Sequence, residues 1–242
     1  MSGEGSNISD SDRPQMQLVR VWDLPTRAFH WLLAASLAGS WLTAEIGYDW
    51  FQMHFYLGYL ALGLVAFRLI WGFMGSTYAR FAHFLHGPAM IARYLRGEED
   101  WRYRIGHNPV GGWAIVLLLA LVGVQAASGL FISDDILYAG PYNGIVSSNL
   151  ADRLNWFHHT SFNLLLAATG LHIAAALWYN VVLKRPLIQA IWHGHRPLDR
   201  QTFRPVEPVD TLWLRGTIVA LIVACAIAAL IYFAPPPTDY FY

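Results

Sequence analysis

Two histidines, His158 and His172, stand fourteen residues apart in the apolar stretch NWFHHTSFNLLLAATGLHIAAAL, which begins at Asn155. On an α-helix, fourteen steps of about 100° end within about 40° of four full turns. Both imidazoles therefore point from one face, at depths that differ by about 21 Å. His159 points well away from that face. One helix thus offers two metal ligands at two depths.

Two further histidines open apolar stretches of their own, His30 near Ala28 and His54 near Trp50. Consecutive spans run in opposite directions, so depth pairs His54 with His158 on one side and His30 with His172 on the other. Ionisable groups inside a membrane are costly and indicate function. Two imidazoles from different helices suit a six-coordinate haem iron, whereas zinc requires three or four converging ligands.

Small residues lie one turn from the candidate ligands. They are Gly58 after His54, Ala34 after His30, and Ala168 and Ala176 on either side of His172, with Gly170 nearby. Such residues leave room for a flat macrocycle, although small residues also let membrane helices approach closely. The non-redox alternative is a structural anchor, in which each histidine only hydrogen-bonds a neighbouring helix.

The elements that must position these histidines are membrane spans. The chain is 55% hydrophobic and only 13% charged, whereas soluble domains have about 25% charged residues. Spans must be helical, because backbone polar groups cannot stay unpaired in hydrocarbon. We therefore expect an all-α integral membrane protein, a four-helix haem-binding bundle plus a fifth C-terminal helix, with spans near Ala28–Ile46, Trp50–Phe73, Val110–Ser133, Ala151–Leu183 and Thr211–Ala234.

Basic residues predict the orientation. Fifteen of the sixteen Lys and Arg residues fall on one side, before the first span, in the loops after the second and fourth, or at the adjoining span ends, where Arg68 and Arg215 lie; only Arg153 falls on the opposite side. By the positive-inside rule the N-terminus is cytoplasmic and the C-terminal tail periplasmic. The outer loops are acidic, with Glu45, Asp49, Asp134, Asp135, Asp152 and Asp239.

The remaining segments complete the organisation. Residues 1–17 are polar and read as a disordered cytoplasmic tail, 18–195 as the di-haem domain, 196–210 as a cytoplasmic linker, and 211–242 as the fifth helix with its periplasmic tail. The segment from Ala82 to Gly97 is amphipathic and is expected on the inner surface. A single cysteine, Cys225, excludes an internal disulfide and a four-cysteine iron–sulfur cluster.

Several motifs together resemble the bacterial di-haem cytochrome b561 family, which is related to the b-type cytochrome subunits of nickel–iron hydrogenases and formate dehydrogenases. The resemblance covers roughly residues 19–195. Its motifs are VWDLPTRAFHW, which contains His30, HFYLGYLALGLVAFRLIWG, which begins with His54, then GHNPVGGW, SGLFISDDILYAGP, and the pair His158 and His172.

The resemblance implies two haems b with bis-histidine ligation, and electron transfer in the bacterial inner membrane between a quinone and a periplasmic redox protein such as a cytochrome c or a hydrogenase. Lipid and quinone are then the other partners, and no nucleic acid is expected. The fifth span departs from the family's four-helix core.

Haem propionates need cations or donors near the interface. The candidates are Arg27 and Arg68 on the inner side and Arg153 on the outer side; each could equally be an ordinary interfacial arginine. His107 and Asn108 precede the third span at the depth of the inner haem, where they could hydrogen-bond a quinone. Asn108 followed by Pro109 is also a standard helix start.

A stand-alone superoxide:quinone oxidoreductase is the alternative function, as some di-haem relatives are. It requires positive charge around the outer haem to collect superoxide. The acidic outer loops would repel that anion. The sequence therefore favours an electron-transfer subunit of an oxidoreductase complex over an enzyme acting alone.

Overall fold

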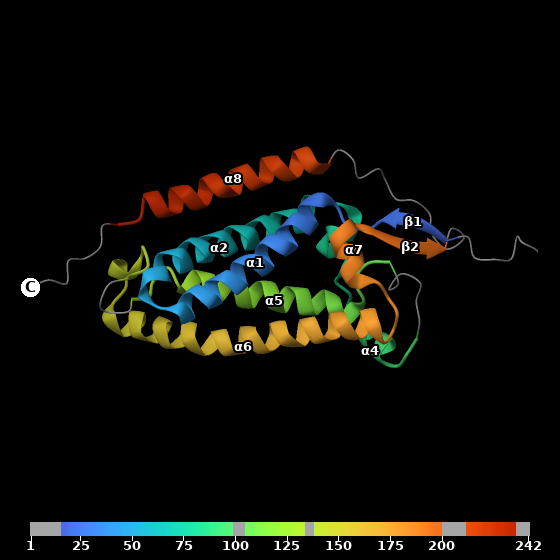
Figure 1. The fold of residues 1–242 in the computed structure, drawn as a ribbon, viewed down its shortest axis with the longest axis horizontal. Coiled ribbons are helices and arrows are strands. Elements are labelled where there is room, and N and C mark those ends of the chain that lie inside the picture. Colours follow the sequence, from blue (N-terminus) through green and yellow to red (C-terminus); the bar gives the residue numbers. More distant parts are fainter. Residues whose placement is uncertain (1–15, 99–104, 134–137, 200–211, 236–242) are drawn as a thin grey trace, which may run out of the picture.

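The computed structural model describes residues 16–98, 105–133, 138–199 and 212–235. Five long helices dominate it: α1 (Leu24–Ile46), α2 (Phe51–Met74), α5 (Pro109–Ser128), α6 (Ser148–Val181) and α8 (Leu212–Tyr232). They run side by side along one axis (Figure 1). Each coincides with one of the five predicted stretches to within a few residues, apart from the C-terminal end of α5, which stops at Ser128.

Four of these helices, α2, α5, α6 and α8, are long and apolar enough to cross a membrane. Together with the low charge content, they identify a multi-pass membrane protein. The 23-residue α1 is as long as its neighbours, but Ser36, Ser40 and Thr43 interrupt its apolar sequence. Composition therefore does not single it out as a span, and the fifth crossing stays a prediction.

Side-chain caps begin two of the helices. Asp23 caps α1 by accepting a hydrogen bond from the Thr26 amide at 2.6 Å, and Asn108 caps α5 by accepting one from the Gly111 amide at 2.6 Å. A proline follows in the first turn of each helix, where its missing N–H costs nothing. The predicted cap at Asn108 is confirmed.

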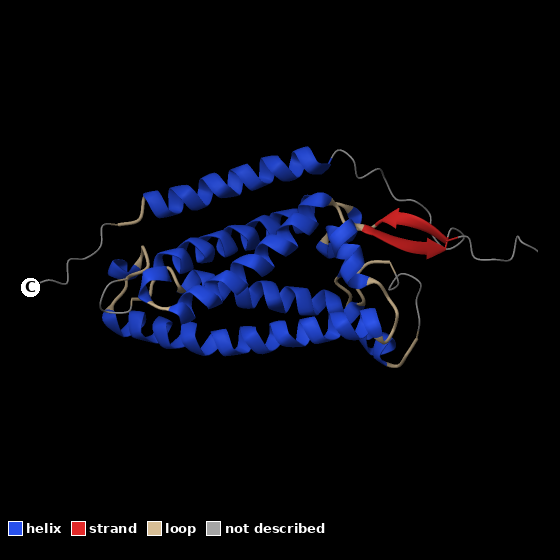
Figure 2. Ribbon diagram, viewed as in Figure 1, coloured by secondary structure: helices blue, strands red, loops and turns tan. Residues whose placement is uncertain are grey.

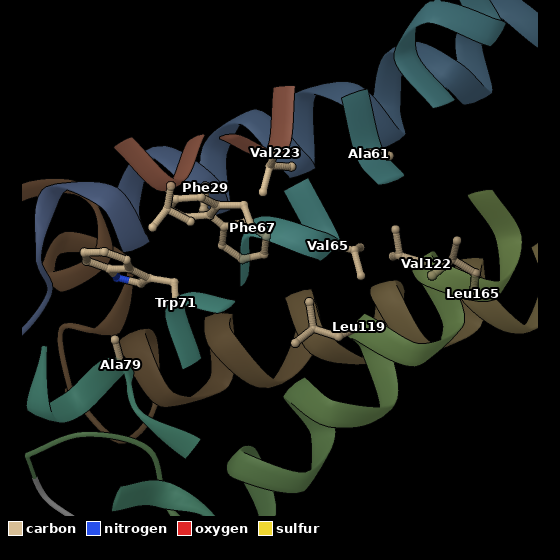
Figure 3. Close-up of a cluster of buried hydrophobic side chains, with 11 residues drawn as sticks. Phe29, Ala61, Val65, Phe67, Trp71, Ala79, Leu119, Val122, Leu165 and Val223 are labelled. Carbon is tan, nitrogen blue, oxygen red and sulfur yellow. The ribbon is translucent and has the colours of Figure 1, made fainter. Parts of the chain in front are cut away.

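The hydrophobic core lies among α1, α2, α5 and α8. α1 packs most extensively on α2, α5 packs on α2 and α6, and α8 packs on α2 and α1. The buried cluster contains Phe29, Ala61, Val65, Phe67, Trp71, Ala79, Leu119, Val122, Leu165, Val219 and Val223 (Figure 3). In contrast, α6 has a single buried residue, Leu165. Among the described residues its extensive contacts are with α5 and α7, not with α1 or α2.

A small two-stranded sheet departs from the expected all-α architecture. Strand β1 (Met16–Arg20) pairs antiparallel with β2 (His195–Asp199) at one end of the bundle (Figure 2). β1 begins inside the segment assigned to the tail, and β2 occupies the start of the segment assigned to the linker. The pairing ties the chain before α1 to the chain after α7 (Leu187–His193).

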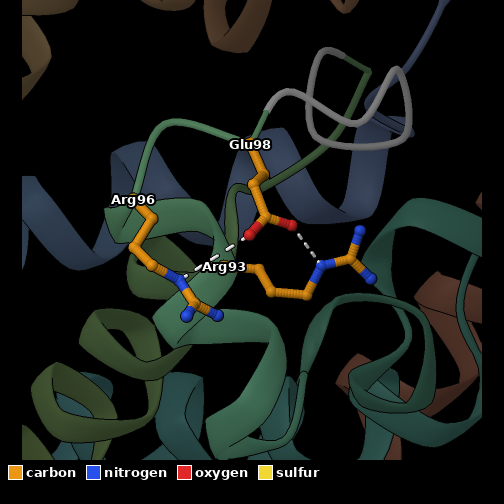
Figure 4. Close-up of polar contacts among 3 residues, drawn as sticks. All are labelled: Arg93, Arg96 and Glu98. Carbon is orange, nitrogen blue, oxygen red and sulfur yellow. Dashed lines mark hydrogen bonds and ion pairs between the residues drawn. The ribbon is translucent and has the colours of Figure 1, made fainter.

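Short elements fill the connections. The segment predicted to be amphipathic forms α3 (Phe81–Phe84) and α4 (Pro88–Leu95), and Gly87 with Pro88 separates them. Beyond α4, Glu98 bridges Arg93 at 2.6 Å and Arg96 at 3.6 Å (Figure 4). These pairs are exposed and stabilise little. Three short 3₁₀ helices also lie in the described connections, at Tyr48–Trp50, Thr77–Ala79 and Asn143–Ile145.

Candidate functional site

The four histidines form two pairs, each between α6 and one of the helices α1 and α2; His172 is exposed, and the other three are half-buried. His30 of α1 faces His172 of α6 with ring centroids 6.5 Å apart. His54 of α2 faces His158 of α6 with centroids 6.4 Å apart. The structure therefore brings together the residues that depth alone had paired, whereas His159 is exposed and points elsewhere. Their role as ligands stays a prediction.

Both separations suit one metal ion between two imidazoles. A metal–imidazole nitrogen bond is about 2 Å long, so an ion held by both rings sets their centroids about 6 Å apart. Direct hydrogen bonding between the two rings would bring them closer. Among the described residues, no three His, Cys, Asp or Glu side chains converge as a metal site. The donor set is thus two imidazoles from opposite sides, which is the arrangement that a porphyrin iron takes.

Hydrogen bonds orient the pair His54–His158, called the outer pair after its predicted side of the membrane, with His30–His172 as the inner pair. His54 Nδ1 lies 2.9 Å from the Ser40 carbonyl oxygen. A carbonyl only accepts, so His54 donates from Nδ1 and its Nε2 keeps a free lone pair. His158 Nδ1 lies 3.0 Å from the Ser128 hydroxyl oxygen at the end of α5. In the inner pair, by contrast, His30 Nδ1 is buried without a hydrogen-bond partner.

Two glycines close in sequence to the candidate ligands open onto empty space. A Cβ added at Gly58 or at Gly170 would meet no atom within 4 Å. Glycines that serve close packing look different, because a Cβ at Gly72 would lie 2.0 Å from the Phe81 ring and one at Gly216 would lie 2.4 Å from Pro25. Gly58 lies one turn after His54 on the same helix face, so it leaves room beside that imidazole. Gly170 stands two residues before His172 and is exposed on the opposite face of α6, so its open space is not beside a histidine pair. Gly58 therefore fits a flat cofactor better than close helix packing.

Arginines gather at the end of the bundle that carries the sheet. Arg68 is 3% exposed and donates to the Ala79 carbonyl at 3.0 Å, while its Nη1 is buried without a partner. Arg27 donates to the Trp192 carbonyl, and its Nε is buried and unpaired. Arg196, which the sequence had not singled out, is 7% exposed and also has an unpaired Nε. These donors are available to an anionic group, whereas Arg153 is exposed on α6.

A buried carboxylate, Asp23, holds together the helix ends on the side of the bundle that carries the sheet. Asp23 is 1% exposed. Besides capping α1, it accepts hydrogen bonds from Trp71 Nε1 at 3.2 Å and from the Ser76 amide at 3.3 Å. It therefore ties the start of α1 to the end of α2, which sets the depth of His30.

His107 and Asn108 lie beside the inner pair. The His107 ring stands 4.7 Å from Trp22 and 4.8 Å from Phe84, centroid to centroid. Burial, with the nearby Arg68 charge next in effect, lowers the pKa of His107 to about 3, so the imidazole is neutral. Its Nδ1 is buried without a partner.

Two tyrosines extend this group. Asn108 Nδ2 donates to the Tyr179 hydroxyl at 3.0 Å, and the Tyr179 and Tyr94 hydroxyls lie 2.7 Å apart. Burial and the hydrogen bond to Tyr179 raise the pKa of Tyr94 to about 12, so the phenol stays protonated. Tyr179 lies seven residues after His172, nearly two turns along the same helix face. That spacing was a sequence signal for Tyr179, whereas Tyr94 and Ser128 come from elements whose packing the sequence does not specify.

Comparisons with known proteins agree with this geometry. The family model described as prokaryotic cytochrome b561 matches residues 21–194, which include all four histidines. Similar proteins are each named "Probable Ni/Fe-hydrogenase B-type cytochrome subunit". The one from Azotobacter vinelandii is 27% identical, with 74% of this chain and 88% of that protein covered. The one from Rhodobacter capsulatus is 25% identical, with 80% and 89% covered. No solved structure matches the chain.

Proposed function

The chain belongs to the prokaryotic cytochrome b561 family, and from this premise we propose that it is a di-haem electron carrier of a bacterial inner membrane. It transfers electrons between the quinone pool and a periplasmic redox partner. Membership in a b-type cytochrome family implies haem b as the cofactor. The names of the similar proteins, all hydrogenase cytochrome subunits, favour a hydrogenase over a cytochrome c as the partner.

The observation that carries the proposal is the two histidine pairs. His54 and His158 hold the outer haem, and His30 and His172 hold the inner haem. The centroid separations of 6.4 Å and 6.5 Å leave one metal position in each pair. Haem b with two axial imidazoles has no open coordination site, so the chemistry it supplies is electron transfer without bond formation.

The orientation follows the basic residues. The sheet, α4 and α7 share one end of the bundle (Figure 1). Arg20, Arg93 and Arg196 lie in β1, α4 and β2, so we assign this end to the cytoplasm. α1 crosses the membrane as the fifth span, because its 23 residues run beside α2 for about the thickness of a bilayer core. With five spans, the start of α1 is then cytoplasmic and the end of α8 periplasmic.

Arginines balance the propionates of the two haems. Arg27 and Arg68 serve the inner haem, because each has a buried and unpaired donor nitrogen at its end of the bundle. A buried donor without a partner costs about 1–3 kcal/mol, and a carboxylate would remove that cost. Arg153 is exposed at the opposite end and serves the outer haem from solvent.

A quinone head group binds beside the inner haem at His107 and Asn108. The Asn108 carboxamide oxygen is committed to capping α5, and one hydrogen of Nδ2 is committed to Tyr179. The second Nδ2 hydrogen and the neutral His107 imidazole remain to donate to or accept from the quinone oxygens. His107 and the two tyrosines then supply groups that can hold or pass a proton.

The experiment that tests the carrier function is haem quantification on the purified chain, followed by reduction with quinol. We expect two haems b per chain by the pyridine haemochrome assay and a Soret and α-band that respond to quinol. Purified protein without these bands would leave the structural anchor as the better reading. Co-purification of a hydrogenase from native membranes tests the partner.

The quinone site has its own test at Asn108. Asn108→Asp keeps the oxygen that caps α5 but loses the Nδ2 donor, and Asn108→Ala loses both, with about 1 kcal/mol of helix stability. We expect both variants to keep two haems and to slow quinol-driven haem reduction. Wild-type reduction rates in both would remove Asn108 from the quinone site.

A further inference from the structure

The outer pair contains a hydrogen bond between a ligand and a side chain that can be replaced. Ser128, the last residue of α5, is 5% exposed. Its Oγ lies 3.0 Å from His158 Nδ1 and 2.9 Å from the Gln125 carbonyl oxygen. The partner of His54 is a helix carbonyl, which mutation cannot remove.

The proton positions follow from what each group can do. A carbonyl only accepts, so the single hydroxyl proton of Ser128 goes to Gln125. The Ser128 oxygen must then accept from His158, which places a proton on Nδ1 and leaves Nε2 as the lone-pair donor. Ser128 therefore selects the tautomer of His158 that can bind a metal through Nε2.

The surrounding contacts hold the His158 ring in place. Gln125 Nε2 donates to the His158 carbonyl at 3.0 Å, and the Ser161 hydroxyl donates to Gln125 Oε1 at 2.5 Å. A Cβ at Gly129 would stand 3.3 Å from His158 Cε1, so that glycine lies against the ring edge. α5 thus positions the ligand on α6 through polar contacts inside an apolar bundle.

We propose that Ser128 is a positioning residue that sets the tautomer and basicity of His158 and so lowers the reduction potential of the outer haem. The proposal rests on the bis-histidine haem proposed above. A hydrogen bond from Nδ1–H makes an imidazole a stronger electron donor through Nε2, which favours ferric iron. The inner haem differs, because His30 Nδ1 has no such partner.

The test measures the midpoint potentials of both haems in Ser128→Ala by redox titration, together with the EPR g values of the ferric haems. We expect two haems, one midpoint shifted upward and the other unchanged, and altered g values for one low-spin species. The matched control is Ser36→Ala. Ser36 is buried in α1 and donates to the Leu33 carbonyl at 2.9 Å, as Ser128 does to the Gln125 carbonyl, but among the described residues no hydrogen bond joins it to any of the four histidines.

A second pair of variants keeps the test decisive if Ser128→Ala loses its outer haem. Thr and Val have the same shape, so Ser128→Thr keeps the hydroxyl and Ser128→Val removes it. Wild-type potentials in the Thr variant, with a shifted potential or a lost outer haem in the Val variant, support the proposal. Equal behaviour of the two overturns it, as do two haems with unchanged potentials in Ser128→Ala. Absence of haem from the wild-type chain would instead overturn the proposed function itself.

Discussion

At the scale of single residues, one helical step decides which of two adjacent histidines faces a partner imidazole. His158 and His159 are neighbours in sequence, yet only His158 faces His54, and His159 is exposed. The fourteen-residue interval to His172 carried this information, because it nearly completes four turns. Side-chain chemistry alone would not have distinguished the two imidazoles.

Replacing His172 tests the pairing directly. His172→Ala removes one axial ligand of the inner haem and leaves His30 alone, so we expect about one haem per chain by the pyridine haemochrome assay. His159→Ala is the matched control and should keep two. An unchanged haem content in His172→Ala would refute the pairing of His30 with His172.

The sequence allowed the four histidines to be paired, but not their hydrogen-bond partners to be identified. Depth and rotation follow from counting along a helix, so His30, His54, His158 and His172 could be paired without a structure. Which side chain receives a ligand's second proton depends on how α5 is rotated against α6. Ser128 is therefore visible only in the folded bundle, as is the burial of Arg196 by a strand that no pattern indicated.

At the scale of elements, α6 packs on α5 and α7 but makes no extensive contact with α1 or α2 among the described residues. α2 packs on α1, α5 and α8, and its Gly63 and Gly72 stand within reach of neighbouring side chains. Gly58 lies on the same helix but meets nothing. The sequence left open whether the small residues serve close helix packing or leave room for a macrocycle. Gly63 and Gly72 fit the first use, and Gly58 fits the second.

Substitution of Gly58 distinguishes these uses. In the absence of a cofactor, Gly58→Val would fill open space and even favour the helix slightly, since Gly is about 1 kcal/mol worse than Ala in a helix. Beside a haem the added methyl groups compete with the ring. We expect Gly58→Val to lose the outer haem in part or fully, measured as haem per chain after purification.

The matched control for Gly58 is Gly63→Ala, where a Cβ would contact Ile227 of α8 at 3.4 Å. It should retain both haems, because that face of α2 turns to α8. Full haem content in Gly58→Val would mean that the space near Gly58 is not used by the cofactor.

At the scale of the whole molecule, the apolar, weakly charged stretches of the sequence predicted the five long helices and their approximate bounds. Long apolar stretches leave no alternative to helices in a membrane, and the ends differed from prediction by a few residues in most cases. The β1–β2 pairing joins segments that are about 180 residues apart in sequence. Short strands without an alternating pattern give no sequence signal, so the sheet could not be anticipated.

Helix α8 lies beyond the family match, which covers residues 21–194 and leaves out β1 and β2 as well. It is held at both ends, where Gly216 packs against Pro25 and where the Tyr142 hydroxyl donates to the Leu230 carbonyl at 2.6 Å. It contributes Val219 and Val223 to the core but none of the four histidines. Its outward side chains, such as Leu221 and Ile222, are exposed.

Removal of residues 212–242 therefore separates haem binding from assembly. We expect the shortened chain to keep two haems, because the ligands lie on α1, α2 and α6, and to melt at a lower temperature, because Val219 and Val223 leave the core. Recovery of the redox partner from native membranes should fall, since α8 adds a further exposed apolar face, with Leu221 and Ile222, to the four-helix core. Loss of a haem on removal would instead make α8 part of the cofactor-binding bundle, and undiminished partner recovery would exclude it as a docking element.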